Sequence, residues 1–221
     1  MNQRGDTIIE VLFAVTVFSL VAVAGLSLMN QGTAMAQRSL EIGLVRDQMD
    51  AQADALRYVH NAYIANIGEA GATTTTVWHE VARDHAVRQA QNFDSTVVDL
   101  KCRLPQSSDP SSPDSDGEPY AIDTRKLDGT GGSPALSLNQ LDNVDNTVTY
   151  SKVHYYEEDN YKKQPLSPAK PEGLWVQPVY SAGSDGTPGY YDFHIRACWL
   201  TPGQATPVTL GTIVRLYDPE V

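Results

Sequence analysis

The most regular feature of the chain is an apolar run between residues 7 and 29, in which Glu10 is the only formally charged side chain. At about 1.5 Å of rise per residue, this run predicts a helix roughly 35 Å long, enough to cross a hydrocarbon core of about 30 Å. The apolar core of a secretory signal is about half that length, so the pattern favours a membrane-spanning helix. A carboxylate in hydrocarbon costs on the order of 3 kcal/mol, so we expect Glu10 to pair with a cation.

Between residues 37 and 67, apolar residues recur at steps of three and four positions, which is typical of one face of an amphipathic helix. No proline interrupts residues 7 to 67, so the two segments predict one continuous helix about 90 Å long. Two helices broken at residues 30 to 33 are the alternative. We expect the middle of the apolar face to pack beneath a head domain through Val45, Met49, Leu56 and Val59. The recurring apolar positions are Leu40, Leu44, Val45, Met49, Leu56, Val59, Tyr63 and Ile64.

The end of the chain carries the pattern of antiparallel strands. Apolar and aromatic residues dominate residues 174 to 176, 190 to 199 and 208 to 217, and Gly and Pro turns separate these stretches. In the middle stretch Tyr191 and Phe193 fall on one face, and His194 falls on the other. The expected fold class is α+β, with a C-terminal antiparallel β-sheet head packed on the amphipathic half of the long helix.

The middle of the chain predicts shorter elements. Gly and Thr between residues 68 and 76 end the long helix, and Thr76 then N-caps a second helix over residues 77 to 92. Ser, Pro, Asp and Gly dominate residues 105 to 118, which predicts a mobile loop. The remaining expectations are a strand at residues 97 to 102, apolar pieces within loops at 120 to 122 and 136 to 141, a strand from 147 to 156, and a chain broken by Pro165, Pro168 and Pro171.

Charge and cysteine content narrow the functions that the chain can have. The net charge of -11 disfavours general binding to nucleic acid, because phosphate backbones attract basic proteins. The two cysteines, Cys102 and Cys198, favour a disulfide in a chain exported past a membrane, and two buried, unlinked thiols are the alternative.

Catalytic patterns are absent from the sequence: it has no phosphate-binding Gly-rich loop with Lys, no Gly-x-Ser-x-Gly and no Cys-x-x-Cys. His79 and His85 are six residues apart, which places them about 120° apart around a helix, so they do not form a zinc pair. We therefore expect no enzyme activity and no resident cofactor.

One acidic loop resembles an EF-hand calcium loop, with Asp114 and Asp116 as candidate ligands and Asp123 at the twelfth place. Ser112 replaces the usual first Asp and Asp123 the usual bidentate Glu, and both changes weaken a calcium site. An unliganded loop is the alternative. A second open question is whether the tyrosines form an exposed contact surface or pack in the core. The dense set is Tyr155, Tyr156, Tyr161, Tyr190 and Tyr191.

The start of the chain resembles a prepilin of the type IV pilus and type II secretion pseudopilin superfamily. In that family a short basic leader ends in Gly, and the apolar helix that follows has Glu as its fifth mature residue. Here Arg4 and Gly5 end the leader, Asp6 is the first mature residue and Glu10 is the fifth. The resemblance implies cleavage after Gly5 by a prepilin peptidase, methylation of the new amine on Asp6, and pairing of Glu10 with a neighbouring subunit's terminal amine.

The domain organisation implied by the resemblance is a leader at residues 1 to 5, an assembly helix at 6 to 29, its amphipathic continuation at 30 to 67, and a head at 68 to 221. The expected function is a structural subunit that sits in the inner membrane as a prepilin and then in an extracellular filament with other pilin subunits. Its acidic head would serve assembly or adhesion to a host-cell or surface ligand. Pilins usually begin with Phe or Met, so Asp6 and the large head favour a minor pilin. The alternatives are a pseudopilin of a secretion or DNA-uptake machine and an uncleaved single-pass membrane-anchored binding domain.

Overall fold

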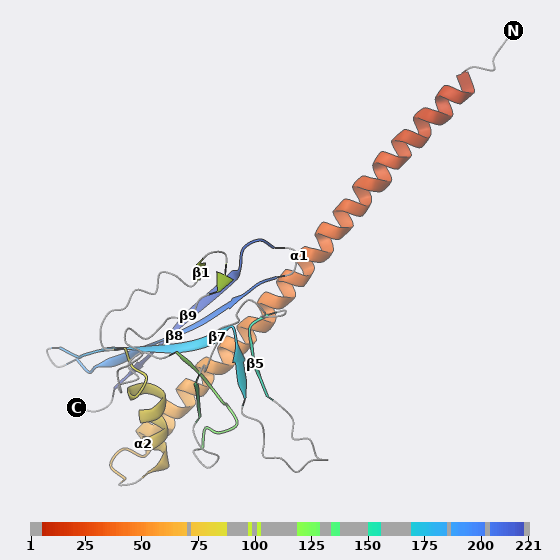
Figure 1. Cartoon of the computed structure of the whole chain (residues 1–221). Coiled ribbons are helices and arrows are strands. Elements are labelled where there is room, and N and C mark those ends of the chain that lie inside the picture. The colour runs from red at the N-terminus through yellow and green to blue at the C-terminus, as the bar shows by residue number, and fades with distance from the viewer. Residues whose placement is uncertain are drawn as a thin grey trace, which may run out of the picture. The chain divides into compact units, whose positions relative to one another are not determined.

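The computed structural model describes residues 6–69, 72–87, 97–98, 101–102, 119–128, 134–137, 150–155, 169–184, 187–201 and 204–218 (Figure 1). The chain divides into two compact units, Met1–Ile42 and Gly43–Val221, and each is described by itself. The helical elements are α1 (Asp6–Ala65), α2 (Thr73–Trp78) and a π-helical turn, η1 (His79–Arg83).

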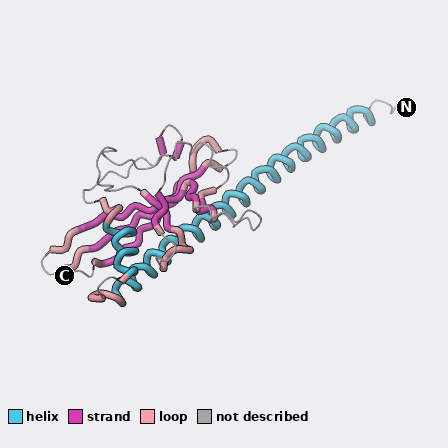
Figure 2. Tube along the Cα trace, turned by 60° about the horizontal axis from the view of Figure 1, so that its bottom comes forward, coloured by secondary structure: helices cyan, strands magenta, loops and turns pink. Residues whose placement is uncertain are grey.

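A five-stranded antiparallel sheet forms the centre of the second unit, with the strand order β4-β3-β7-β8-β9 (Figure 2). Its longest ladder joins β8 to β9, from Tyr190 opposite Tyr217 to Trp199 opposite Val208. These strands are β3 (Tyr120–Ile122), β4 (Ala135–Ser137), β7 (Leu174–Ser181), β8 (Tyr190–Trp199) and β9 (Val208–Tyr217). Two further antiparallel pairs are β1 (Val97–Val98) with β2 (Lys101–Cys102), and β5 (Lys152–His154) with β6 (Lys170–Glu172).

The expected α+β layout, a long N-terminal helix packed on a C-terminal antiparallel sheet, is confirmed. Residues 6 to 65 form one helix, and residues 30 to 33, the alternative break point, lie inside it. The helix ends three residues before Gly68, whose φ of 93° is in the left-handed region that glycine adopts without strain.

Within the second unit, α1 buries one face against the sheet. Val45, Met49, Leu56 and Val59 are buried, as the apolar spacing predicts. The buried positions recur every three or four residues, which is the period of one helix face. The complete buried set on α1 is Val45, Met49, Gln52, Ala53, Ala55, Leu56, Val59, His60 and Tyr63.

Not every recurring apolar position of this helix is buried. Leu44 and Ile64 are 37% and 44% exposed, because they lie just beyond the first and last buried residues of α1, Val45 and Tyr63. Two polar residues, Gln52 and His60, take core positions instead.

The second helix differs from its prediction. It begins at Thr73 rather than at residue 77, and η1 ends it at Arg83. Burial of Trp78 against the sheet outweighs the low helix propensity of the preceding threonines. After the turn that follows, Val87 pairs with β7, donating to the Pro178 carbonyl at 2.9 Å. Residues 88 to 92 lie outside the described part of the chain.

Several strands also differ from their predictions. Residues 97 to 102 make two short paired strands rather than one, and the stretches expected in loops form β3 and β4. Pro171 lies inside β6 instead of breaking the chain. The predicted strands β8 and β9 have the bounds that the sequence indicates, while β7 runs on to Ser181. The predicted loop at 105 to 118 and the expected strand residues 147 to 149 lie outside the described residues.

Candidate assembly interface

The residues expected to direct processing and assembly lie at the start of α1. Gly5 is outside the described residues, and Asp6 is the first residue of the helix. Glu10 follows four residues later and is exposed. Positions four apart lie on the same helix face, so residues 6 and 10 occur on one side of α1.

The first half of α1 exposes every large apolar side chain that it carries. Its most apolar window has a mean hydropathy of 2.5, and none of it is buried. The exposed fractions of these side chains run from 43% at Val17 to 73% at Phe18. Each such side chain gains about 1.5–3 kcal/mol when it leaves water, so this surface is compatible with a membrane anchor or a signal segment.

Two hydroxyl groups within this segment are satisfied by the helix itself. Thr16 donates to the Phe13 carbonyl at 2.8 Å, and Ser19 donates to the Val15 carbonyl at 2.7 Å. These bonds leave no unpaired hydroxyl donor at either position, which suits an apolar environment. Glu10 is the one ionisable side chain between residues 7 and 29.

Hydrogen bonds from polar side chains anchor the second half of α1 to the sheet. Gln52 bonds both backbone groups of Ile122 in β3, at 3.0 and 2.7 Å. His60 Nε2 lies 2.8 Å from the Tyr217 carbonyl at the end of β9 and therefore donates to it. The sequence pattern missed both residues, because a polar side chain on a helix is usually solvated.

An aromatic cluster fills the space between α1, α2 and β8. Trp78 is fully buried and stacks on Tyr63, with ring centroids 5.7 Å apart. Tyr191 and Phe193 on β8 contact the same indole ring at 5.7 and 6.0 Å. The head is thus built on the amphipathic half of α1.

A disulfide joins Cys102 on β2 to Cys198 on β8, with the sulfur atoms 1.97 Å apart and the Cα atoms 5.7 Å apart. The expected pairing is therefore present, rather than two free thiols. The two cysteines are 96 positions apart in the sequence, so the disulfide closes a long loop of the chain.

The histidines considered for zinc have other contacts. His79 Nε2 lies 3.1 Å from Arg83, and the His85 ring lies 4.7 Å from the Tyr120 ring. Among the described residues, no group of three or more His, Cys, Asp or Glu side chains is placed to hold a metal ion.

Asp123 is the one calcium candidate in the described part of the chain, because Asp114 and Asp116 lie outside it. Asp123 is fully buried, and Arg125 donates to its two carboxylate oxygens at 2.9 Å each. Burial alone would raise the pKa of the carboxyl, but the hydrogen bonds and charge of Arg125 outweigh burial and lower it. To bind calcium, Asp123 would have to exchange this partner.

The tyrosines divide between core and surface. Tyr191 is buried, and burial together with the charge of Asp218 raises its pKa to about 12. Tyr155 is 38% exposed, and Tyr190 is half-buried beneath the Arg215 guanidinium at 4.0 Å. Tyr156 and Tyr161 lie outside the described residues.

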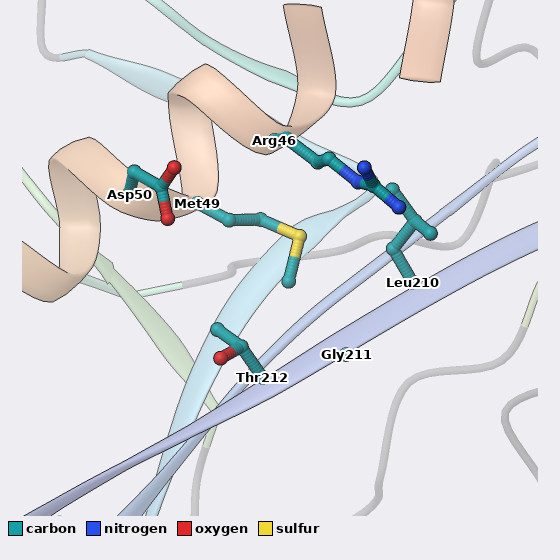
Figure 3. A pocket seen from close by; sticks show the side chains of 6 residues that line it. All are labelled: Arg46, Met49, Asp50, Leu210, Gly211 and Thr212. Atoms are coloured by element: carbon teal, nitrogen blue, oxygen red, sulfur yellow. The ribbon is translucent and has the colours of Figure 1, made fainter. Parts of the chain in front are cut away.

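A groove of about 230 Å³ lies between α1 and β9 within the second unit (Figure 3). Its floor is Met49, and its walls carry one cation and one anion, Arg46 and Asp50. The strand side consists of Leu210, Gly211 and Thr212. The lining therefore combines a thioether, a guanidinium, a carboxylate and a hydroxyl group.

No protein-family model, curated protein or solved structure matches this chain.

Proposed function

We propose that the chain is a non-enzymatic structural subunit of a type IV pilus or a related filament. The observation that carries the proposal is the first half of α1, an exposed apolar helix with the single carboxylate Glu10 four residues after Asp6. A membrane covers such a surface before assembly, and the equivalent helices of neighbouring subunits cover it afterwards.

Cleavage after Gly5 by a prepilin peptidase would give Asp6 a free amine. An amine and a carboxylate buried together each relieve the desolvation of the other, so the Glu10 carboxylate of one subunit pairs with the amine of its neighbour. This pairing sets the axial register between the helices of neighbouring subunits. Asp6 adds its own carboxylate beside the amine, which favours a minor pilin over the bulk subunit of the filament.

The head built on residues 43 to 65 of α1 is then the exposed part of the subunit. It carries most of the acidic residues of the chain and is stabilised by the Cys102–Cys198 disulfide, which suits an extracellular location. Its role is assembly or adhesion through surface contacts.

A photocrosslinking experiment tests assembly without assuming cleavage. A photoreactive phenylalanine derivative at Phe13, in cells that produce filaments, is expected to link the chain to another filament subunit. The same group at Tyr58, which is 56% exposed in the second unit, serves as the control. If Phe13 gives no crosslink to any subunit while the protein is present in the membrane, the chain is an unassembled anchor and the proposal fails.

A further inference from the structure

The outer edge of β9 has open backbone hydrogen-bonding groups, and from these we infer a contact with another chain. In the described part of the sheet β9 is the last strand, paired on one side with β8. The Asp218 N–H donates to the Gly189 carbonyl at 2.7 Å and so extends this ladder by one pair. Because hydrogen-bonded positions alternate along an antiparallel strand, the even-numbered residues of β9 bond β8, and the odd-numbered residues turn their backbone groups outward.

The backbone bond from His60 supports this assignment. Its acceptor is the carbonyl of Tyr217, an odd-numbered residue, so α1 caps the outward side of β9 at that end. No partner occurs within the described part of the chain for the outward backbone groups of Thr209, Gly211, Ile213 and Arg215. All four residues are exposed.

Most exposed edges carry features that prevent pairing with another strand, such as lysine, proline or a bulge. Residues 208 to 217 contain neither lysine nor proline, and their register with β8 is continuous. The one charged residue, Arg215, is held by two 2.7 Å hydrogen bonds to Asp192 on β8. Ile213 is 59% exposed on this edge.

We infer that this edge binds the β9 strand of a second copy of the chain, antiparallel and with a two-fold axis at Thr212. In this register Gly211 faces Ile213 of the second copy, and Thr209 faces Arg215. Each facing pair exchanges two backbone hydrogen bonds, so the four pairs form about eight bonds and use every open group from Thr209 to Arg215.

Side-chain shape and charge favour the second copy as the occupant. The exposed Ile213 of each chain covers the bare backbone of Gly211 in the other, where the nearest atoms to an added Cβ are 4.0 Å away. The only charged edge residue faces a threonine, so no like charges oppose one another. On the other face, the groove of about 230 Å³ beside Met49 borders Thr212, the residue on the two-fold axis.

Moving the axis to Ile213 would place Thr209 opposite Tyr217. The His60 side chain occupies the outward side of β9 at Tyr217, so no strand pairs there, and this register keeps three facing pairs, about six backbone bonds, against about eight with the axis at Thr212. The register centred on Thr212 is therefore the one that satisfies the edge.

The contact is two-fold and self-complementary, whereas neighbours along a filament are related head to tail. The contact therefore links chains of two different filaments. This consequence rests on the proposed function, whereas the association of two copies is independent of it.

Cysteine crosslinking of the full-length chain in detergent tests the pairing and its register. Thr212→Cys places a sulfur atom on the two-fold axis at a non-hydrogen-bonded pair, where cross-strand side chains are closest. Mild oxidation is expected to give a disulfide-linked dimer on non-reducing gels. Ile213→Cys, which would face Gly211, and Ile64→Cys, an exposed position on α1, are the controls and are expected to give about tenfold less dimer.

A second substitution separates edge pairing from chance collision. Ile213→Pro removes an outward N–H and leaves the β8 ladder intact, so it is expected to reduce the Thr212→Cys dimer about tenfold without changing the thermal unfolding midpoint. If that variant fails to fold, Ile213→Lys tests the same edge. The inference would be overturned if Thr212→Cys gave no more dimer than Ile64→Cys. It would also be overturned if the edge substitutions left the amount of Thr212→Cys dimer unchanged, because the partner would then not be the β9 strand of a second copy.

Discussion

Gln52 on α1 and Ile122 on β3 form a reciprocal pair of hydrogen bonds: Nε2 donates to the Ile122 carbonyl at 3.0 Å, and the Ile122 N–H donates to Oε1 at 2.7 Å. The side-chain amide thus replaces a neighbouring strand where β7 no longer pairs with β3, since Tyr120 is the only β3 residue paired with β7. Gln52 is 2% exposed, so water does not supply these bonds.

Replacing Gln52 with Ala is therefore expected to lower the free energy of unfolding of the head by about 2–4 kcal/mol, because it leaves a buried N–H and a buried carbonyl unpaired. Gln48→Ala is the matched control, since that half-buried side chain makes one long bond of 3.4 Å to Val153. Urea unfolding followed by tryptophan fluorescence measures both variants. Equal effects at the two positions would show that the paired bonds do not stabilise the helix on the sheet.

The Cys102–Cys198 disulfide is expected to contribute about 4–5 kcal/mol in the chain-entropy model, because it closes a loop with a sequence separation of 96. Replacing both cysteines with Ala is expected to lower the free energy of unfolding by that amount. A reducing agent is expected to reproduce the loss in the natural chain and to change nothing in the double variant. If the reducing agent did not change the free energy of unfolding of the natural chain, this prediction would be contradicted.

Stability is expected to fall between pH 10 and pH 12 because of Tyr191. Its pKa in the folded chain is raised to about 12 by burial and by Asp218, while an unfolded tyrosine titrates near pH 10. The unfolded state therefore binds fewer protons over this range, so its formation becomes more favourable as the pH rises, by up to about 1.4 kcal/mol per pH unit.

Tyr191→Phe is expected to make that decline shallower, and the buried Tyr120, whose pKa is also raised, accounts for part of the remainder. Denaturation midpoints measured from pH 9 to pH 12 compare the two proteins. A variant with the same slope as the natural chain would exclude Tyr191 as the source.

Glu10→Gln is expected to reduce the amount of the chain in sheared filaments by at least about tenfold, because the neutral amide carries no charge to offset a buried ammonium group. Asp47→Asn, an exposed acidic position farther along α1, is expected to have little effect. Quantitative immunoblots of filament and membrane fractions give the ratio. Incorporation of the Glu10→Gln variant at the natural level would remove the assembly role from Glu10.

Long periodic segments were predictable from the sequence because their local patterns agree with their final environment. α1 follows from an apolar run and a three-to-four spacing without proline, and β8 and β9 follow from apolar and aromatic stretches bounded by Gly and Pro turns. The processing and assembly roles of Gly5, Asp6 and Glu10 rest on their spacing in the sequence alone and stay predictions, because no tertiary contact in the described part of the chain bears on them.

Short and tertiary features were not predictable in the same way. β3 and β4 have three residues each and exist because they pair with each other across an intervening loop. The threonines of α2 become helical because Trp78 is buried against Tyr63. Likewise, the roles of Gln52 and His60 depend on unpaired backbone groups of β3 and β9, which a one-dimensional pattern does not contain.

The proposed role as a filament subunit depends on whether the chain is processed at Gly5. The most direct measurement is the intact mass and the first residue of the protein recovered from its native membrane or filaments. We predict a chain that begins at Asp6, with or without a methyl group on its amine. A chain that begins at Met1 in assembled filaments or in the membrane would contradict the proposed processing and leave a plain membrane anchor.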